Sequence, residues 1–266
     1  NGGDMKNWMV IAGMALVSNL TSAATPMSCQ AQSGKFVTPV VELYTSEGCS
    51  SCPPADAWLS KQAQRTDINA NFLAFHIDYW DDIGWPDRFA NPAYTQRQYA
   101  RVHRKGSSQV YTPQVMIGEQ TGVSWSWPDR SESFIKQANS ELAIVSIALK
   151  ANGNSEKWKA EVVLSSLNAV PNTQWYLAVY QDGLSSKVHA GENAGKLLRH
   201  DRVVRQWLGP YPFNKKLTMK DFNIALSNAG VMGQTGLLAV LENSSNGQVL
   251  QSLKLPLSQC KAAASK

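Results

Sequence analysis

The stretch Val40 to Asp56, V-V-E-L-Y-T-S-E-G-C-S-S-C-P-P-A-D, decides how the rest of the chain is interpreted. Its first five residues, up to Tyr44, form an apolar, β-branched run that predicts a buried strand. Residues 45–48 have the composition of a turn. Apolar residues then recur at helical spacing from Ala55 onwards. A strand that passes through a turn into a helix is therefore expected here.

A C-x-x-C pair, Cys49 and Cys52, lies where this strand gives way to the helix. Free backbone N–H groups and the helix dipole favour a thiolate at such a place, so we expect Cys49 to be the reactive and more exposed thiol. One cysteine of the pair can attack a partner sulfur, and the other can resolve the mixed disulfide. A zinc knuckle and an inert disulfide are the alternatives. Structural zinc needs four ligands and the sequence has no second C-x-x-C, so we predict neither metal nor cofactor.

Residues 1–24 have the features of a secretory signal peptide with a few upstream residues. Lys6 precedes the apolar run Trp8 to Val17, and small residues follow at 21–24. This run is too short to span a bilayer, so we expect no stable membrane insertion after cleavage. The mature protein is expected in the periplasm or outside the cell, where disulfides are stable.

The other two cysteines, Cys29 and Cys260, lie near the two ends of the mature chain. The simplest pairing is a structural disulfide between them. Two free or intermolecular thiols are the alternative.

The formal net charge is +5, and no basic residues are interleaved with aromatic ones in a recognisable nucleic-acid motif. We therefore expect no nucleic-acid partner.

The pattern along the chain changes near Ser140. Before it, a second apolar strand is predicted at 71–79, and Thr112-Pro113 precedes a short strand, a position that favours a cis peptide bond beside the cysteines. After it, short strands follow one another at hairpin-like spacing, which is typical of an antiparallel sandwich. The predicted organisation is a first domain at 25–140, a β-rich domain at 141–260 and a tail at 261–266.

The order of strand, C-x-x-C at a helix start, strand, and Thr-Pro before a further strand resembles the thioredoxin fold. At closer range the chain resembles a family of secreted bacterial proteins known as domain of unknown function 1223. The segments that carry this resemblance are V-E-L-Y-T-S-E-G-C-S-S-C-P-P-A-D, F-H-I-D-Y-W-D-D-I-G-W-P-D, R-Q-Y, Y-T-P-Q-V-M-I-G and G-E-N-A-G-K-L-L-R-H-D-R-V-V-R. The implied fold class is α/β: a thioredoxin-like domain followed by a β-rich, antiparallel sandwich-like domain.

The resemblance to thioredoxin-like proteins also implies roles for individual residues. Cys49 would be the nucleophile, Cys52 the resolving cysteine, and Pro113 the residue that holds the substrate chain. The buried acid of such enzymes lies six positions before the first cysteine, where this chain has Leu43. The neighbouring Glu42 is therefore either a proton relay or a paired structural acid, and strand alternation would turn it away from the cysteines unless a bulge shifts the register.

We predict an exported thiol–disulfide oxidoreductase that acts on protein thiols or disulfides. Its substrate groove would be lined by Thr112, Tyr79, Trp80 and Trp85. One alternative is a redox-inert, partner-binding module in which the C-x-x-C pair forms only a structural disulfide. Another is a thiol-based copper carrier that uses the two cysteines and His76.

Overall fold

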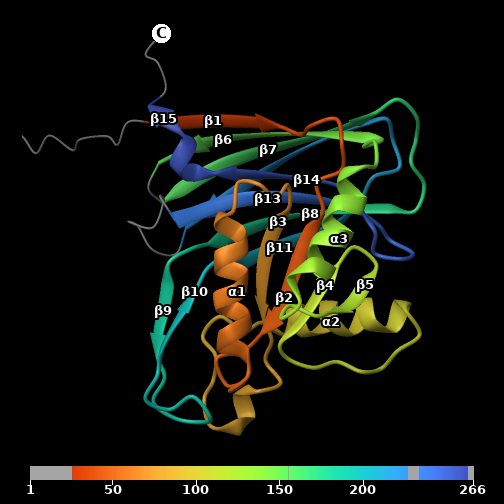
Figure 1. Ribbon diagram of the computed structural model, residues 1–266. Helices are drawn as coiled ribbons and strands as arrows, with labels where there is room; N and C mark the ends of the chain where they lie inside the picture. Colours follow the sequence, from red (N-terminus) through yellow and green to blue (C-terminus); the bar gives the residue numbers. More distant parts are fainter. Residues whose placement is uncertain (1–25, 155, 227–233, 263–266) are drawn as a thin grey trace, which may run out of the picture.

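The computed structural model describes residues 26–154, 156–226 and 234–262, and the predicted signal peptide lies outside them. Two β-sheets dominate these residues (Figure 1). The smaller sheet is antiparallel, has the order β12-β7-β6-β1-β15, and consists of β1 (Met27–Gln32), β6 (Val145–Gly153), β7 (Lys157–Ser166), β12 (Leu217–Ala225) and β15 (Lys261–Ala262).

The larger sheet has eight strands in the order β14-β13-β8-β11-β3-β2-β4-β5. It consists of β2 (Val40–Thr45), β3 (Asn71–His76), β4 (Gln114–Ile117), β5 (Gln120–Val123), β8 (Thr173–Gln181), β11 (Val203–Pro212), β13 (Thr235–Asn243) and β14 (Val249–Pro256). The helices are α1 (Cys52–Gln64), α2 (Pro92–Arg104) and α3 (Pro128–Asn139), with short 3₁₀ turns η1 (Asp81–Ile83) and η3 (Leu257–Gln259).

The prediction of an α/β thioredoxin-like domain followed by a β-rich domain is wrong. The protein is mostly β, with 45% strand and 19% helix. Moreover, β11 pairs in parallel with β3 at Val203 and Ala74, so strands from before and after residue 140 share one sheet. An apolar run predicts that a strand is buried, but it does not say which strand will cover its free edge. Here that edge is covered by a strand more than a hundred residues away.

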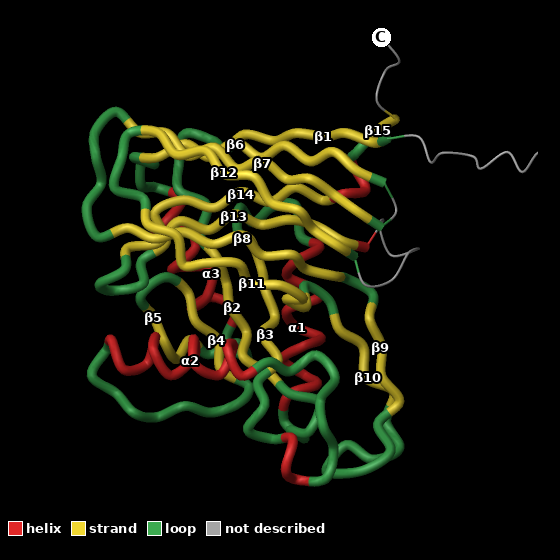
Figure 2. The backbone as a smooth tube through the Cα atoms, turned by 180° about the vertical axis from the view of Figure 1, so that it is seen from behind, coloured by secondary structure: helices red, strands yellow, loops and turns green. Residues whose placement is uncertain are grey.

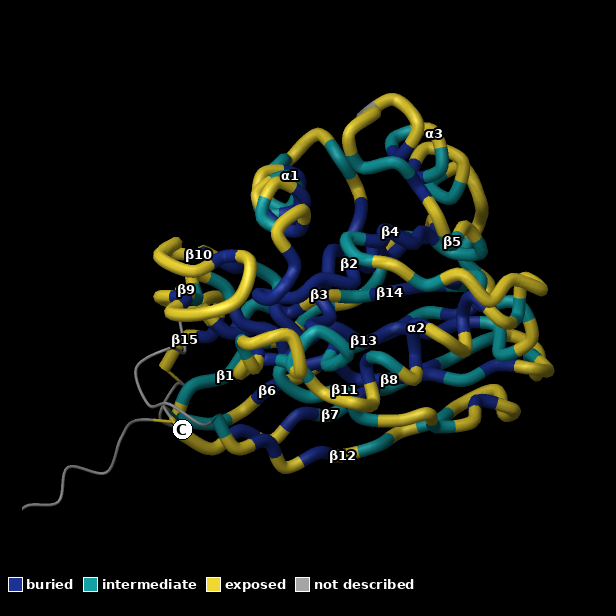
Figure 3. The backbone as a smooth tube through the Cα atoms, turned by 90° about the horizontal axis from the view of Figure 1, so that it is seen from below, coloured by how far each residue is buried: buried dark blue, intermediate teal, exposed yellow. Residues whose placement is uncertain are grey.

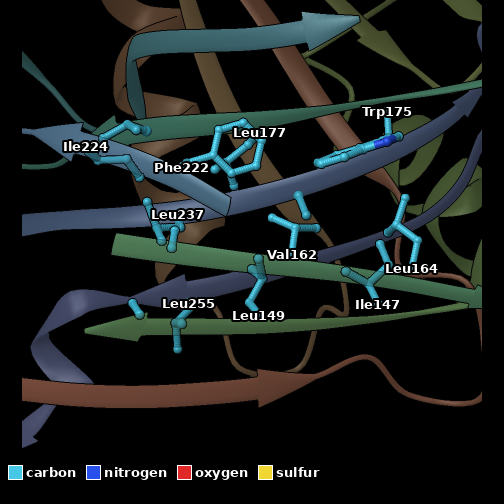
Figure 4. Packing of buried hydrophobic residues seen from close by; sticks show 14 of the residues in the cluster. Ile147, Leu149, Val162, Leu164, Trp175, Leu177, Phe222, Ile224, Leu237 and Leu255 are labelled. Carbon is cyan, nitrogen blue, oxygen red and sulfur yellow. The ribbon is translucent and has the colours of Figure 1, made fainter. Parts of the chain in front are cut away.

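The two sheets pack face to face around one hydrophobic core (Figure 4). Alternate residues of β8 point into it, among them Trp175 and Leu177, while Ala178 and Tyr180 point to the other side of the larger sheet. Trp175 meets Phe222 of β12 edge to face, with ring centroids 5.9 Å apart. The period-2 pattern of these strands directs alternate side chains to the two faces of each sheet, although each sheet combines strands from before and after residue 140.

The helices cover both faces of the β2–β3 part of the larger sheet (Figure 3). Val41 and Leu43 of β2 pack with α1 and α3, whereas Val40 and Tyr44 pack on the opposite face, where α2 lies. The pairing of β2 with β3 shows no register shift, so strict alternation decides which side chain faces which helix.

A two-stranded hairpin, β9 (Leu184–Lys187) and β10 (Leu197–His200), runs alongside α1 and is seen from behind in Figure 2. It brings residues near position 190 next to the start of α1, which lies about 140 positions earlier in the chain. At the β1–β15 edge of the smaller sheet, Cys29 of β1 and Cys260, which directly precedes β15, form the predicted disulfide.

Candidate functional site

Cys49 and Cys52 form a disulfide across the start of α1, with their Cα atoms 5.4 Å apart. The helix begins at Cys52, whose N–H donates to the Cys49 carbonyl at 3.2 Å. The next two residues, Pro53 and Pro54, have no N–H, which costs little in the first turn because those donors have no helical partner. The expected free N–H groups around Cys49 are therefore largely absent or engaged.

Both cysteines are completely buried, so the expectation of a more exposed Cys49 is wrong. The Cys49 sulfur lies 3.8 Å from the carbonyl oxygen of Thr112, and the Thr112–Pro113 peptide bond is cis, as predicted. Trp80 donates its indole N–H to the Thr112 hydroxyl at 2.8 Å. The structure thus brings the cysteines together with Thr112, Pro113 and Trp80.

Tyr79 and Trp85 lie in the same loop region but have different neighbours. Burial raises the pKa of Tyr79, and Gln98 and Thr112 oppose this shift. Trp85 donates its indole N–H to Oε2 of Glu47 at 2.8 Å, so this end of its ring is directed to the polar cluster described below.

Glu42 lies on the face of β2 that is turned away from α1. Its carboxylate contacts Arg97 of α2 at 2.7 Å and Arg101 at 3.5 Å, and it accepts a hydrogen bond from Tyr44. Burial would raise the pKa of Glu42, but Arg101 and Arg97 outweigh it and lower the pKa to about 2. These are the contacts of a paired structural acid, and the structure does not bring Glu42 together with the cysteines.

A buried cluster of acids and histidines, Glu47, Asp56, His76, Asp87 and His200, lies beside the C-x-x-C pair and is called the polar cluster below. Asp87 Oδ2 is 2.6 Å from Nδ1 of His76 and accepts the Glu47 N–H at 2.9 Å. His200 lies between two carboxylates, with Nε2 at 3.2 Å from Glu47 Oε1 and Nδ1 at 3.7 Å from Asp56 Oδ2.

The pKa values in the polar cluster are driven apart. Burial raises the pKa of Asp56, although His200, His76 and Thr45 oppose it. Burial would also raise the pKa of Asp87, but His76 more than reverses this and the net shift is downward. For His76, burial lowers the pKa and Asp87 more than compensates, so it is raised. Acids and bases whose environments separate their pKa values are typical of sites that transfer protons.

Asp56 links the polar cluster to the cysteines. It lies four residues after Cys52 in α1, so both side chains project from the same face of the helix. The sequence contained this signal, because C-S-S-C-P-P-A-D places an acid one helical turn after the second cysteine. His200 carried no such signal, since only the β9–β10 hairpin brings it to α1.

The copper hypothesis placed His76 next to the cysteines. Nδ1 of His76 is bonded to Asp87, and the ring packs against Phe89 and His200. In the part of the chain that the structure describes, no three His, Cys, Asp or Glu side chains are grouped as metal ligands.

Among the described residues, no helix has the length and apolar character needed to cross a membrane.

Two solved structures resemble this fold. Protein AGR_C_4864 from Agrobacterium tumefaciens is 22% identical with a TM-score of 0.61, and the match covers 88% of this chain and all of that one. HBP35 of Porphyromonas gingivalis is 14% identical with a TM-score of 0.62, covering 88% of this chain and 79% of that chain. At these identities the likeness concerns the fold alone. No curated protein matches the sequence.

A family model described as "Protein of unknown function (DUF1223)" matches residues 40–241, which include the C-x-x-C pair, the polar cluster and the β9–β10 hairpin. This match covers most of the chain and agrees with the family that the sequence motifs indicate. The protein therefore belongs to the DUF1223 family.

Proposed function

We propose that this protein is an exported thiol–disulfide oxidoreductase that acts on protein thiols or disulfides in the periplasm or outside the cell. The observation that carries the proposal is the Cys49–Cys52 disulfide at the start of α1, beside the buried titratable groups of the polar cluster, of which Asp56 lies one turn further along the same helix face. A purely structural disulfide needs no such groups beside it.

The proposed thiol–disulfide exchange conserves electrons and protons. A substrate thiolate attacks the Cys49 sulfur, the Cys49–Cys52 bond breaks, and Cys52 leaves as a thiolate. A second substrate thiolate then attacks the substrate sulfur of the mixed disulfide and releases Cys49. The substrate dithiol loses two electrons and two protons, and the protein disulfide gains them. The same steps in reverse reduce a substrate disulfide.

The proton for Cys52 comes from Asp56 in this proposal. A carboxyl whose pKa is raised by burial is a better match for a thiol than an ordinary Asp. His200, 3.7 Å away, connects Asp56 with Glu47 and with the His76–Asp87 pair. This assigns to Asp56 the role of proton relay that the sequence alone suggested for Glu42.

The proposal is tested by trapping. Cys52→Ser removes the resolving step, so mixed disulfides through Cys49 should accumulate with a reactive protein disulfide and be released by a reductant. Cys49→Ser should trap nothing, and Cys29→Ser serves as the matched control because its disulfide belongs to the smaller sheet, whereas Cys49 follows β2 of the larger sheet. If the Cys52→Ser protein captures no partner under denaturant-free conditions, the oxidoreductase proposal is wrong.

A second candidate function, a binding module with a structural C-x-x-C staple, is favoured by one observation: both cysteines have no exposed surface. It predicts that the pair stays oxidised in the presence of excess dithiol until the protein unfolds. Reduction of the folded protein decides between the two functions.

A further inference from the structure

The segment that joins β9 and β10, Val188–Lys196, folds back onto the loop that carries Cys49 and is called the strap below. It is an ordered turn, because the Gly195 N–H donates to the Val188 carbonyl at 2.8 Å and the Val188 N–H donates to the Lys196 carbonyl at 3.0 Å. These bonds give the strap a defined shape next to α1.

Asn193 is the inner contact of the strap and is completely buried. Its side-chain amide donates to the carbonyls of Glu47 and Cys49, both at 2.9 Å. The amide oxygen in turn accepts from Nζ of Lys196 at 2.8 Å. Separating a buried amide from all these partners costs free energy, so these hydrogen bonds hold the strap against the cysteine loop.

Glu192 is the outer contact. Its carboxylate accepts the Ser50 N–H at 3.0 Å. Because Asn193 binds the Cys49 carbonyl, the two strap residues hold both polar groups of the Cys49–Ser50 peptide. The Glu192 carboxylate also puts a negative charge at the start of α1, where the helix dipole favours it. The strap therefore covers the backbone of the nucleophile.

The strap also rests on the loop that carries Trp85. The rings of His189 and Trp85 lie 5.9 Å apart. Gly191 has φ of +70°, and a Cβ there would come within 3.3 Å of the Trp85 Cβ, so the two backbones approach closely. With the Thr112 carbonyl 3.8 Å from the Cys49 sulfur on a different loop, Cys49 is enclosed between separate segments.

We propose that the strap determines which thiols reach the Cys49–Cys52 disulfide, an inference that rests on the proposed oxidoreductase function. Attack on a disulfide requires access to one sulfur along the S–S bond, and the enclosed pair offers no exposed surface. A small dithiol needs only a slight opening, whereas a cysteine in a polypeptide needs the strap to release the Cys49–Ser50 peptide. Glu192 and Asn193 are thus specificity-determining positioning residues: in the closed state they disfavour protein thiols.

The test compares two reductants, dithiothreitol and a reduced, unfolded protein, by the rate at which each opens the Cys49–Cys52 disulfide. Glu192→Ala removes one charge-assisted hydrogen bond, so the rate with the protein thiol should rise roughly tenfold, and the rate with dithiothreitol should rise much less. Glu192→Gln keeps an acceptor and should restore most of the wild-type ratio of rates. Glu156→Ala, an exposed carboxylate in the β6–β7 turn, is the matched control.

Asn193→Ala should shift the ratio further in the same direction. Because Asn193 is buried, its replacement also lowers the stability of the fold, so Glu192→Ala at an exposed position decides the outcome. If the wild-type pair exchanges and Glu192→Ala leaves both rates unchanged, or raises both equally, the strap inference is wrong while the proposed function stands. If neither the wild type nor any strap variant exchanges with either reductant, the proposed function is wrong as well.

Discussion

Arg97 Nη2 lies 2.7 Å from Oε1 of Glu42 and 2.9 Å from Oε2 of Glu242, on the side of the larger sheet opposite α1. Its guanidinium also lies 4.6 Å from the centre of the Trp207 ring. These contacts join α2 to β2 and β13. A buried, paired charge of this kind is costly to leave without its partner.

Glu42→Gln should lower the free energy of unfolding by about 3 kcal/mol, because it leaves Arg97 and Arg101 with a single buried carboxylate. The folded-state pKa of Glu42 is about 2, below its ordinary value of 4.5, so its contribution is present above pH 4.5 and is lost as the pH falls towards 2. Denaturant unfolding of the wild type and the variant across this range measures it.

The rate of disulfide exchange should be unaffected by Glu42→Gln in folded protein. Strand alternation places Glu42 away from the cysteines, with no bulge in the β2–β3 pairing. A loss of exchange that exceeds the loss of folded protein would restore Glu42 as a proton relay.

The Cys29–Cys260 disulfide should stabilise the fold without taking part in exchange. It closes a loop with a sequence separation of 231, and the chain-entropy model gives an upper limit of about 5 kcal/mol for such a loop. Replacing both cysteines with Ser should therefore lower the free energy of unfolding by about 2 to 5 kcal/mol. The rate at which dithiothreitol opens the other disulfide should not change at temperatures where the variant is folded, and a large change would contradict the separation of the two pairs.

Local patterns in the sequence predicted the elements near the site well. The run Val40 to Tyr44 predicted a strand and is β2, and the C-x-x-C pair lies at the start of a helix as expected. Thr112–Pro113 is cis beside Cys49. In each case the signal comes from residues that are neighbours in the chain, where periodicity and turn chemistry act.

What could not be predicted depends on pairing between distant segments. The parallel contact of β11 with β3 merges strands that the sequence assigned to separate fold units. The β9–β10 hairpin carries His200 and Asn193 to α1, although their own neighbourhood in the chain contains nothing that points to cysteines. The burial of Cys49 follows from these long-range contacts, which explains why a position at a helix start was a poor guide to its exposure.

The His76–Asp87 pair should make stability depend on pH in a defined window. The pKa of His76 is raised above 6.5, so its contribution is complete below that value and is lost as the pH rises through the folded-state pKa. The pKa of Asp87 is lowered below 3.8, so its contribution is lost only as the pH falls below that value. The pair therefore contributes most between pH 3.8 and 6.5.

Asp87→Asn should lower the free energy of unfolding by about 3 kcal/mol in this window and by less at alkaline pH. Glu47, Asp56 and His200 also face the pair, so the measured transition belongs to the cluster as a whole. Unfolding at pH 5.5 and at pH 9, roughly one unit or more on either side of an ordinary histidine pKa, measures the difference. An equal loss at both pH values would show that the pair is not charged in the folded protein.

Asp56→Asn separates a chemical role from a structural one. The folded-state pKa of Asp56 is raised by burial above its ordinary value of 3.8, so its charged form costs stability as the pH rises above 3.8. The neutral amide should therefore leave the protein as stable as the wild type at neutral pH, or more so.

The Asp56→Asn variant should nevertheless exchange disulfides roughly 100-fold more slowly, which is the lower range for loss of a positioned proton donor. The pH profile of its exchange rate should also lose the ionisation due to Asp56. The rate of Cys49–Cys52 reduction across pH 5 to 9 measures both effects, with Asp221→Asn as the control at an exposed carboxylate of β12. If Asp56→Asn is stable and exchanges at the wild-type rate with an unchanged profile, the proton for Cys52 comes from solvent and the polar cluster has no part in the exchange.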